Sequence, residues 1–267
     1  MPAAPVMDAI DGDVCRITLA VPERHNSLDL PLLSALEQAI GRAREAAGAG
    51  TVRAVVLGAE GRSFSTGGDL TAFLAHSDTP ADLRAYAQEL VGTLNRVILA
   101  LLDLPVPLIA VVPGAVTGGA AGLMLAADRV AASGTAFLQP YYGEVGFAPD
   151  GGWTALLPLR IGPQKTLAAL QCNDRFDSET LQALGLADWV GPRDGLQEPV
   201  RAWLAGIRAQ SPATLATARA LVWDRARIDH VATRLEAERQ AFLAHIADPA
   251  VIAAMRRFVS SLKAGRP

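Results

Sequence analysis

The feature that most constrains this sequence is a recurring order of apolar strand, glycine-rich loop and helix. Buried strands are predicted over 52–57, 107–112 and 129–132. Helices are predicted after the first two of these strands, over 70–103 with one internal break and over 120–127. This recurrence predicts stacked strand–strand–helix turns whose loops face one side, although no residue-level repeat of the solenoid kind accompanies it.

The two ends of the chain carry different patterns. Near the N-terminus a strand is predicted over 14–20 and a helix over 31–47. After Gly195 the sequence alternates Ala, Arg, Glu and Leu, which is typical of helices. The predicted C-terminal helices span 196–209, 212–225, 228–246 and the residues after Asp248, with Ser211-Pro212 and Asp248-Pro249 as N-cap and N1 pairs. We therefore predict a core over 1–195 that carries the site, and a helical region over 196–267 that serves as an appendage or an oligomer interface.

Composition limits the classes of function. The chain has 267 residues, 51% of them hydrophobic, and a formal net charge of −3 without a basic stripe, which argues against nucleic acid as a partner. Two separated cysteines, Cys15 and Cys172, predict neither a disulfide framework nor a metal cluster and favour a reduced, cytoplasmic setting. No apolar run approaches the ~18 residues of a membrane span, and the N-terminus has no export pattern.

Three glycine-rich segments stand directly before predicted helices, at 64–70, 113–120 and 146–153. Such loops expose backbone N–H groups that no helical carbonyl satisfies, and two of them converging would form an oxyanion hole. The alternative is that the glycines only permit tight turns or close packing. The sequence lacks the phosphate-binding, dinucleotide, serine-hydrolase and zinc motifs, so no metal is predicted.

Four acidic residues are candidates for acid/base chemistry. Asp150 lies inside a glycine-rich loop that leads into a helix, where it is either a proton-transfer group or an N-cap. Glu144 precedes the same loop and either faces the same cavity or is exposed. Asp69 is interpreted as a helix cap, and Asp128 as a carboxylate paired with a backbone or cationic group.

The remaining polar and aromatic candidates give weaker signals. Among the histidines only His25 lies near a plausible ligand path, and a surface role is the simpler interpretation. Tyr141, Tyr142, Phe147 and Trp153 either line a pocket that accepts aromatic groups or pack in the core.

In this order and spacing, the segments Asn26-Ser27-Leu28, 64–70, 113–128 and 146–162 resemble the enoyl-CoA hydratase/isomerase (crotonase) superfamily over essentially the whole chain. The resemblance implies an α/β fold, a crotonase-like spiral of repeated ββα turns with a C-terminal α-helical region, assembled as a homotrimer or homohexamer. It implies an acyl-CoA thioester as substrate, with coenzyme A as part of that substrate and no separate cofactor.

By position, the resemblance assigns the oxyanion hole to the backbone N–H groups of Gly68 and Gly119. It also assigns a set of substrate-binding residues. These are Arg24, Ser27, Leu28, Ser65, Gly67, Asp69, Leu70, Tyr142 and Trp153.

The chain departs from the hydratase pattern at both catalytic glutamates. The first falls on Gly122, which cannot transfer a proton, and the second falls in 141–144, where one extra residue leaves no clean match. Pro149-Asp150-Gly151-Gly152 instead resembles the branch in which one carboxylate moves a proton between C2 and C4, as in Δ3,Δ2-enoyl-CoA isomerases. We therefore predict isomerase chemistry with Asp150, or else Glu144, as the base. The alternatives are hydration, aryl-CoA dehalogenation with a nucleophilic aspartate, and acyl-CoA binding without catalysis.

Overall fold

A six-stranded sheet forms the centre of the molecule. The computed structural model describes residues 4–263. The strand order is β1-β2-β3-β5-β7-β10, antiparallel between β1 and β2 and parallel elsewhere. The strands are β1 (Val6–Asp11), β2 (Val14–Leu19), β3 (Ala54–Ala59), β5 (Leu108–Val112), β7 (Arg129–Ser133) and β10 (Trp189–Gly191). The inner strands β3 and β5 read as continuous apolar runs because helices cover both faces of this parallel sheet.

A second, four-stranded sheet is built from very short strands. Its order is β4-β6-β8-β9, with β4 (Ser63–Ser65), β6 (Ala115–Thr117), β8 (Phe137–Gln139) and β9 (Phe176–Asp177). Each of β3, β5 and β7 is followed within a few residues by β4, β6 or β8, and then by a helix. The predicted spiral of ββα turns is therefore confirmed, and its short strands deliver the glycine-rich loops to a common edge.

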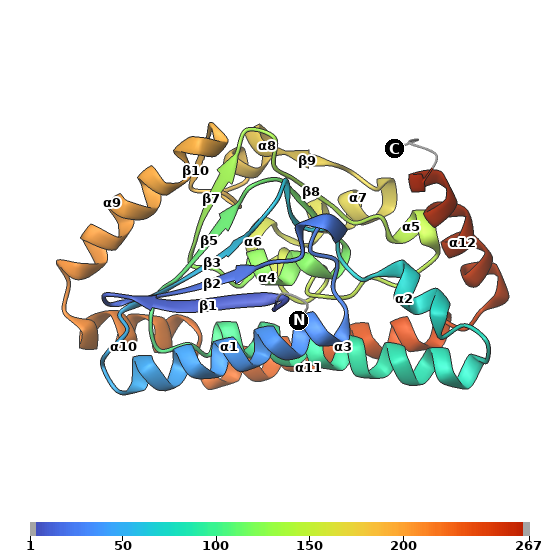
Figure 1. The fold of residues 1–267 in the computed structure, drawn as a ribbon, viewed down its shortest axis with the longest axis horizontal. Coiled ribbons are helices and arrows are strands. Elements are labelled where there is room, and N and C mark those ends of the chain that lie inside the picture. The colour runs from blue at the N-terminus through green and yellow to red at the C-terminus, as the bar shows by residue number, and fades with distance from the viewer. Residues whose placement is uncertain (1–3, 264–267) are drawn as a thin grey trace.

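Helices enclose the sheets on several sides. In the core they are α1 (Leu30–Gly48), α2 (Leu70–Ala75), α3 (Pro80–Leu102), α4 (Ala121–Leu125), α5 (Tyr142–Val145), α6 (Leu157–Ile161), α7 (Pro163–Cys172) and α8 (Ser178–Ala183), with single 3-10 turns η1 (Pro22–Arg24), η2 (Gly118–Ala120) and η3 (Arg193–Gly195). Helices α1 and α3 run beneath the large sheet (Figure 1). The predicted break in 70–103 separates α2 from α3, where Thr79 caps α3.

The C-terminal region is helical, as predicted, with α9 (Gln197–Arg208), α10 (Pro212–Val222), α11 (Arg225–His245) and α12 (Pro249–Lys263). Its two parts cover different faces. Helix α9 packs on the outer face of the large sheet, whereas α11 lies along α3 and places Val231, Leu235 and Phe242 in the main core (Figure 1). Helix α12 contacts α2 and α5. The described part of this region, residues 196–263, thus completes the main core.

Both predicted N-cap and N1 pairs stand at the start of a helix, but only one of the caps uses its side chain. Asp248 accepts a hydrogen bond from the Ala250 N–H, as an N-cap does. Ser211 is the N-cap of α10 and Pro212 its first residue, as predicted, although the Ser211 side chain makes no capping hydrogen bond. Within residues 4–263, no helix has both the length and the hydropathy needed to cross a membrane.

Candidate active site

Two of the glycine-rich loops touch one another. Gly67 has a φ of 75°, and a Cβ built on it would lie 2.7 Å from the carbonyl oxygen of Thr117, so only a glycine permits this approach. Leu28 holds the first loop in place, because its N–H donates to the Gly67 carbonyl at 2.7 Å and its carbonyl accepts from the Asp69 N–H at 3.0 Å. These bonds leave the Gly68 N–H without a partner among the described residues.

The second loop presents its N–H groups at the start of η2. Gly119 is the middle residue of this one-turn helix, where N–H groups have no acceptor within the helix. The Nε1 of Trp153 donates to the Gly118 carbonyl at 2.8 Å and holds the loop in place. Trp153 is fully buried, so this predicted substrate-binding residue supports the loop from inside the fold.

The carboxylate of Asp150 faces this second loop. A Cβ built on Gly119 would lie 3.2 and 3.3 Å from its two oxygens. The approach depends on Gly151, which has a φ of 63° and whose own Cβ would overlap the Gly119 backbone. Asp150 is buried, with 7% of its surface exposed. The turn 149–152 therefore holds one acidic group against the place where the two loops meet.

Tyr142 is the hydrogen-bond partner of Asp150. The hydroxyl of Tyr142, on α5, lies 2.7 Å from Asp150 Oδ1 and 2.8 Å from the Asp150 carbonyl oxygen. Its one hydrogen is shared between these two acceptors. Its ring stands edge-on to Trp153, with centroids 6.3 Å apart. Tyr142, predicted to bind substrate, thus has its hydroxyl committed to the carboxylate, and the aromatic residues here pack in the core.

The pKa of Asp150 is raised from 3.8 to about 7. Burial is the largest cause, since it penalises the charged carboxylate, and the negative charge of Glu238 acts in the same direction. The hydrogen bond from Tyr142 opposes both by favouring the charged form. A carboxyl group with a pKa near neutrality can accept and return a proton at physiological pH.

Gly122 has no space for a side chain. A Cβ built there would overlap the end of the Ile98 side chain and lie 2.5 Å from the Gly151 carbonyl oxygen. The packing therefore agrees with the absence of a glutamate at this position. Any side chain here would push either α3 or the Asp150 turn away.

Glu144 is not brought to the same place. It is an exposed residue of α5, and its Oε1 accepts a hydrogen bond from Asn173 Nδ2 at 3.3 Å. Asn173 also accepts from the Tyr141 N–H at 2.9 Å and holds Tyr141 at a φ of 60° where α5 begins. Of the two predicted bases, the structure joins only Asp150 to the glycine loops.

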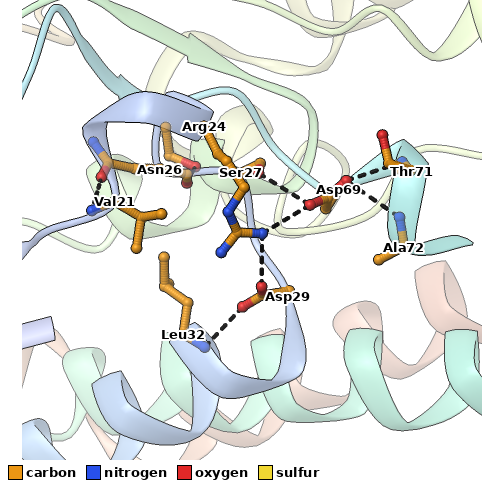
Figure 2. A network of polar contacts seen from close by, with 10 residues as sticks. Val21, Arg24, Asn26, Ser27, Asp29, Leu32, Asp69, Thr71 and Ala72 are labelled. Atoms are coloured by element: carbon orange, nitrogen blue, oxygen red, sulfur yellow. Dashed lines mark hydrogen bonds and ion pairs between the residues drawn. The ribbon is translucent and has the colours of Figure 1, made fainter. Parts of the chain in front are cut away.

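The predicted substrate-binding residues near the N-terminus form a polar network (Figure 2). Arg24 Nη1 donates to Asp29 Oδ2 at 2.8 Å and to Asp69 Oδ2 at 2.9 Å. Each of these aspartates also caps a helix. Asp29 accepts from the Leu32 N–H, and Asp69 accepts from the N–H groups of Thr71 and Ala72 at 2.9 and 3.2 Å. The cap predicted at Asp69 is confirmed.

Other predicted contacts in this segment lie inside the fold. Ser65 is fully buried and donates to the Asn26 carbonyl, and Leu28 is buried as well. Ser27 Oγ lies 3.5 Å from Asp69 Oδ2, and Leu70 is partly buried. These side chains fix the loop that carries Gly68. His25 is half-buried and contacts Ser63 and Arg62.

Two further carboxylates, Asp128 and Glu238, lie outside the glycine-rich loops and accept hydrogen bonds from the backbone. Asp128 accepts from the Leu108 N–H and pairs with Arg219, as predicted. Sequence reasoning missed Glu238, which is buried on α11 and accepts hydrogen bonds from the turn after Asp150. The signal was present in its spacing, because Val231, Leu235, Glu238 and Phe242 share one helical face and the other three are apolar.

Comparisons with known proteins agree with this architecture. A model of the enoyl-CoA hydratase/isomerase family matches residues 9–265. The probable enoyl-CoA hydratase EchA14 of Mycobacterium tuberculosis is 33% identical over 225 residues, covering 79% of this chain and 84% of that protein. The trans-2-decenoyl-(acyl-carrier-protein) isomerase of Streptococcus mutans is 27% identical over 215 residues, covering 80% of each chain.

Among solved structures, the enoyl-CoA hydratase from Bacillus halodurans superposes with a TM-score of 0.87 at 26% identity, covering 95% of this chain and 99% of that one. The fold and the match along the sequence define a crotonase-type protein. This chain belongs to the enoyl-CoA hydratase/isomerase family.

Proposed function

We propose that this chain acts on acyl-CoA thioesters and converts 3-enoyl-CoA to 2-enoyl-CoA through a thioester enolate. The observation that carries the proposal is the buried carboxylate of Asp150, which faces Gly119 and has a pKa raised to about 7. Moving a double bond between neighbouring positions requires one group that takes a proton and then returns it. Coenzyme A belongs to the substrate in this reaction, and no separate cofactor takes part.

The proposed reaction has two proton transfers. Ionised Asp150 removes a proton from C2, the C2–H electrons delocalise through the C3–C4 double bond and the carbonyl, and the thioester oxygen becomes negative. The dienolate then takes the same proton from Asp150 at C4, which leaves the double bond between C2 and C3. Nothing is oxidised or reduced, and Asp150 ends the cycle ionised as it began.

The charge on the thioester oxygen is held by the backbone N–H groups of Gly68 and Gly119 in this proposal. Gly68 has no other partner for its N–H among the described residues, and Gly119 stands at an open helix start. Removing one oxyanion donor in a well-studied protease costs roughly 2.7 to 4 kcal/mol, which gives the scale of this contribution.

Hydration of 2-enoyl-CoA is the second candidate, because the M. tuberculosis relative is named a probable enoyl-CoA hydratase. Against it, hydration in this family uses a pair of acids, and the closed packing at Gly122 excludes one of them. Glu144, the other candidate acid, is exposed and bonded to Asn173. The S. mutans relative is named an isomerase, which supports the first candidate.

One assay separates the candidates. Purified protein is given 3-enoyl-CoA, and the absorbance of the conjugated thioester is followed. The proposal predicts that absorbance rises to the equilibrium level, and that Asp150→Asn abolishes the rise while Glu144→Gln does not. With 2-enoyl-CoA supplied instead, loss of absorbance to 3-hydroxyacyl-CoA at a higher kcat/KM than isomerisation would overturn it. Binding without turnover of either thioester would also overturn it in favour of a binding protein, and turnover of a halogenated aryl-CoA alone in favour of a dehalogenase.

We also propose that the chain assembles as a homotrimer or a dimer of trimers in the cytoplasm. The fold shared with the family supports the assembly, and light scattering of the purified protein tests it: a mass equal to one chain would contradict the proposal.

A further inference from the structure

The turn after Asp150 has N–H groups that need an acceptor. Residues 151–155 lie in a series of turns before α6, where N–H groups have no regular helical partners. In the corresponding turn at Asp69, the aspartate serves its own turn by accepting from the residues two and three positions ahead. The same local arrangement at Asp150 would direct its carboxylate to the N–H groups of Gly152 and Trp153.

Glu238 supplies the acceptor. Its Oε2 accepts from the Gly152 N–H at 2.8 Å. Its Oε1 accepts from the Thr154 N–H at 2.6 Å, the Thr154 hydroxyl at 2.8 Å and the Ala155 N–H at 3.0 Å. Only 4% of Glu238 is exposed. A carboxylate from a helix more than eighty residues further along the chain therefore satisfies three N–H groups of this turn.

We infer that Glu238 is a positioning residue that caps the Asp150 turn in place of Asp150, and so leaves the Asp150 carboxylate free to face Gly119 and transfer protons. The inference rests on the proposed function. It assigns to the C-terminal helix α11 a part in the reaction, because α11 carries the group that decides whether Asp150 is a cap or a base.

The charges around the pair agree with this role. The titratable groups that act on Asp150 are Tyr142 from α5 and Glu238 from α11, while α3 and η2 contribute Leu94, Ile98 and Gly119 to this surface. The Glu238 charge raises the pKa of Asp150, and burial raises the pKa of Glu238 itself, opposed by the four hydrogen bonds it accepts. Arg239, the next residue, is turned to the exposed Glu236.

Glu238→Gln tests the inference, with Glu236→Gln as the matched control on the same helix. The substitution removes the charge and one acceptor, so Asp150 is drawn to the Gly152 N–H. Both changes lower the pKa of Asp150. We expect kcat for 3-enoyl-CoA isomerisation to fall roughly 10- to 100-fold with KM little changed. We also expect the acidic limb of the kcat/KM profile to move to lower pH. Glu236→Gln should match wild type in both.

A purely structural role would reduce the amount of active protein without moving the limb, so a limb that stays at the wild-type pH in folded Glu238→Gln overturns the inference. Thr154→Val, with Thr154→Ser as its conservative partner, covers the case in which Glu238→Gln does not fold. Thr154→Val removes one of the four bonds and should lower kcat several-fold, Thr154→Ser should restore it, and equal rates would overturn the inference. If Asp150→Asn is itself fully active, the proposed function has failed; if Asp150→Asn is inactive and Glu238→Gln is unchanged, only the role of Glu238 has failed.

Discussion

The turns at Asp69 and Asp150 each place an aspartate next to a pair of glycines, and the two carboxylates have opposite surroundings. Each aspartate stands among glycines just before a helical segment. Asp69 is enclosed by donors, because it caps α2 and pairs with Arg24 (Figure 2). Asp150 is buried with one phenol as its donor, and Glu238 takes the N–H groups of its turn. The difference teaches that a distant residue decides whether such an aspartate is a structural cap or a reactive acid.

The largest expected effect comes from replacing the carboxylate that is proposed to react. Asp150→Asn keeps the shape of the side chain but cannot accept a proton from C2. General acid/base groups contribute about 10²- to 10⁴-fold, so we expect kcat/KM for isomerisation to fall by at least roughly 100-fold. In wild type, kcat/KM should rise with pH through about 7 as Asp150 ionises. A kcat/KM that stays constant between about pH 6 and about pH 8 would contradict this assignment.

A thermal melt of the same variant separates lost chemistry from lost folding. The folded-state pKa of about 7 lies above the ordinary value of 3.8, so ionisation of Asp150 destabilises the folded state as pH rises between these values. Asp150→Asn should therefore be more stable than wild type above pH ~7, by an amount that shrinks toward pH ~4. A variant that is less stable than wild type above neutral pH would contradict the burial argument.

The packing beneath the Asp150 turn gives the next effect. Gly122→Ala places a methyl group against Ile98 and the Gly151 carbonyl, and overpacking of this kind typically costs about 1 to 3 kcal/mol. We expect that loss in the free energy of unfolding, measured by denaturant titration, together with reduced activity. An unchanged unfolding midpoint would show that the turn has room for a side chain.

Tyr142→Phe sharpens the comparison by removing the side-chain hydroxyl that donates to Asp150. Since the Tyr142 hydrogen bond lowers the pKa of Asp150, its loss should move the acidic limb of kcat/KM to higher pH. A hydrogen bond to a charged group is worth about 1.5 to 3 kcal/mol, so activity at neutral pH should fall roughly 10-fold or more. A limb displaced to lower pH would mean that the hydroxyl does not stabilise the ionised form.

The smallest expected effect comes from replacing Asp69, the aspartate that caps α2. Asp69→Ala removes the cap of α2, which typically costs about 0.5 to 2 kcal/mol, and leaves Arg24 paired with Asp29. We expect a lower melting temperature with kcat reduced far less than in Asp150→Asn. A loss of kcat as large as that of Asp150→Asn, in folded protein, would mean that the two turns do not differ in the way described.

Much of this fold was predictable because its signals are local. The apolar runs at 52–57 and 107–112, and the glycine loops after them, predicted the repeated turns. Strand β1 was missed because most of its residues are exposed and carry no apolar pattern. Strands β4, β6 and β8 have three residues each, too few for a period to show.

The site was predictable only in part, for a similar reason. Glycine context singled out Asp150 and the two loops, and the cap at Asp69 followed from its neighbours. The bond from Tyr142 depends on the direction of a four-residue helix, and the bonds from Glu238 join positions more than eighty residues apart. Only the apolar spacing on α11 could have indicated that Glu238 points inward.

Exchange of the C2 hydrogens of an acyl-CoA thioester with solvent deuterium, followed by NMR, tests most directly whether Asp150 is the base. It reports proton removal alone and needs no double bond to move. We expect exchange with wild type and with Glu144→Gln at similar rates, and none above the uncatalysed rate with Asp150→Asn. Exchange by Asp150→Asn at the wild-type rate would contradict the account.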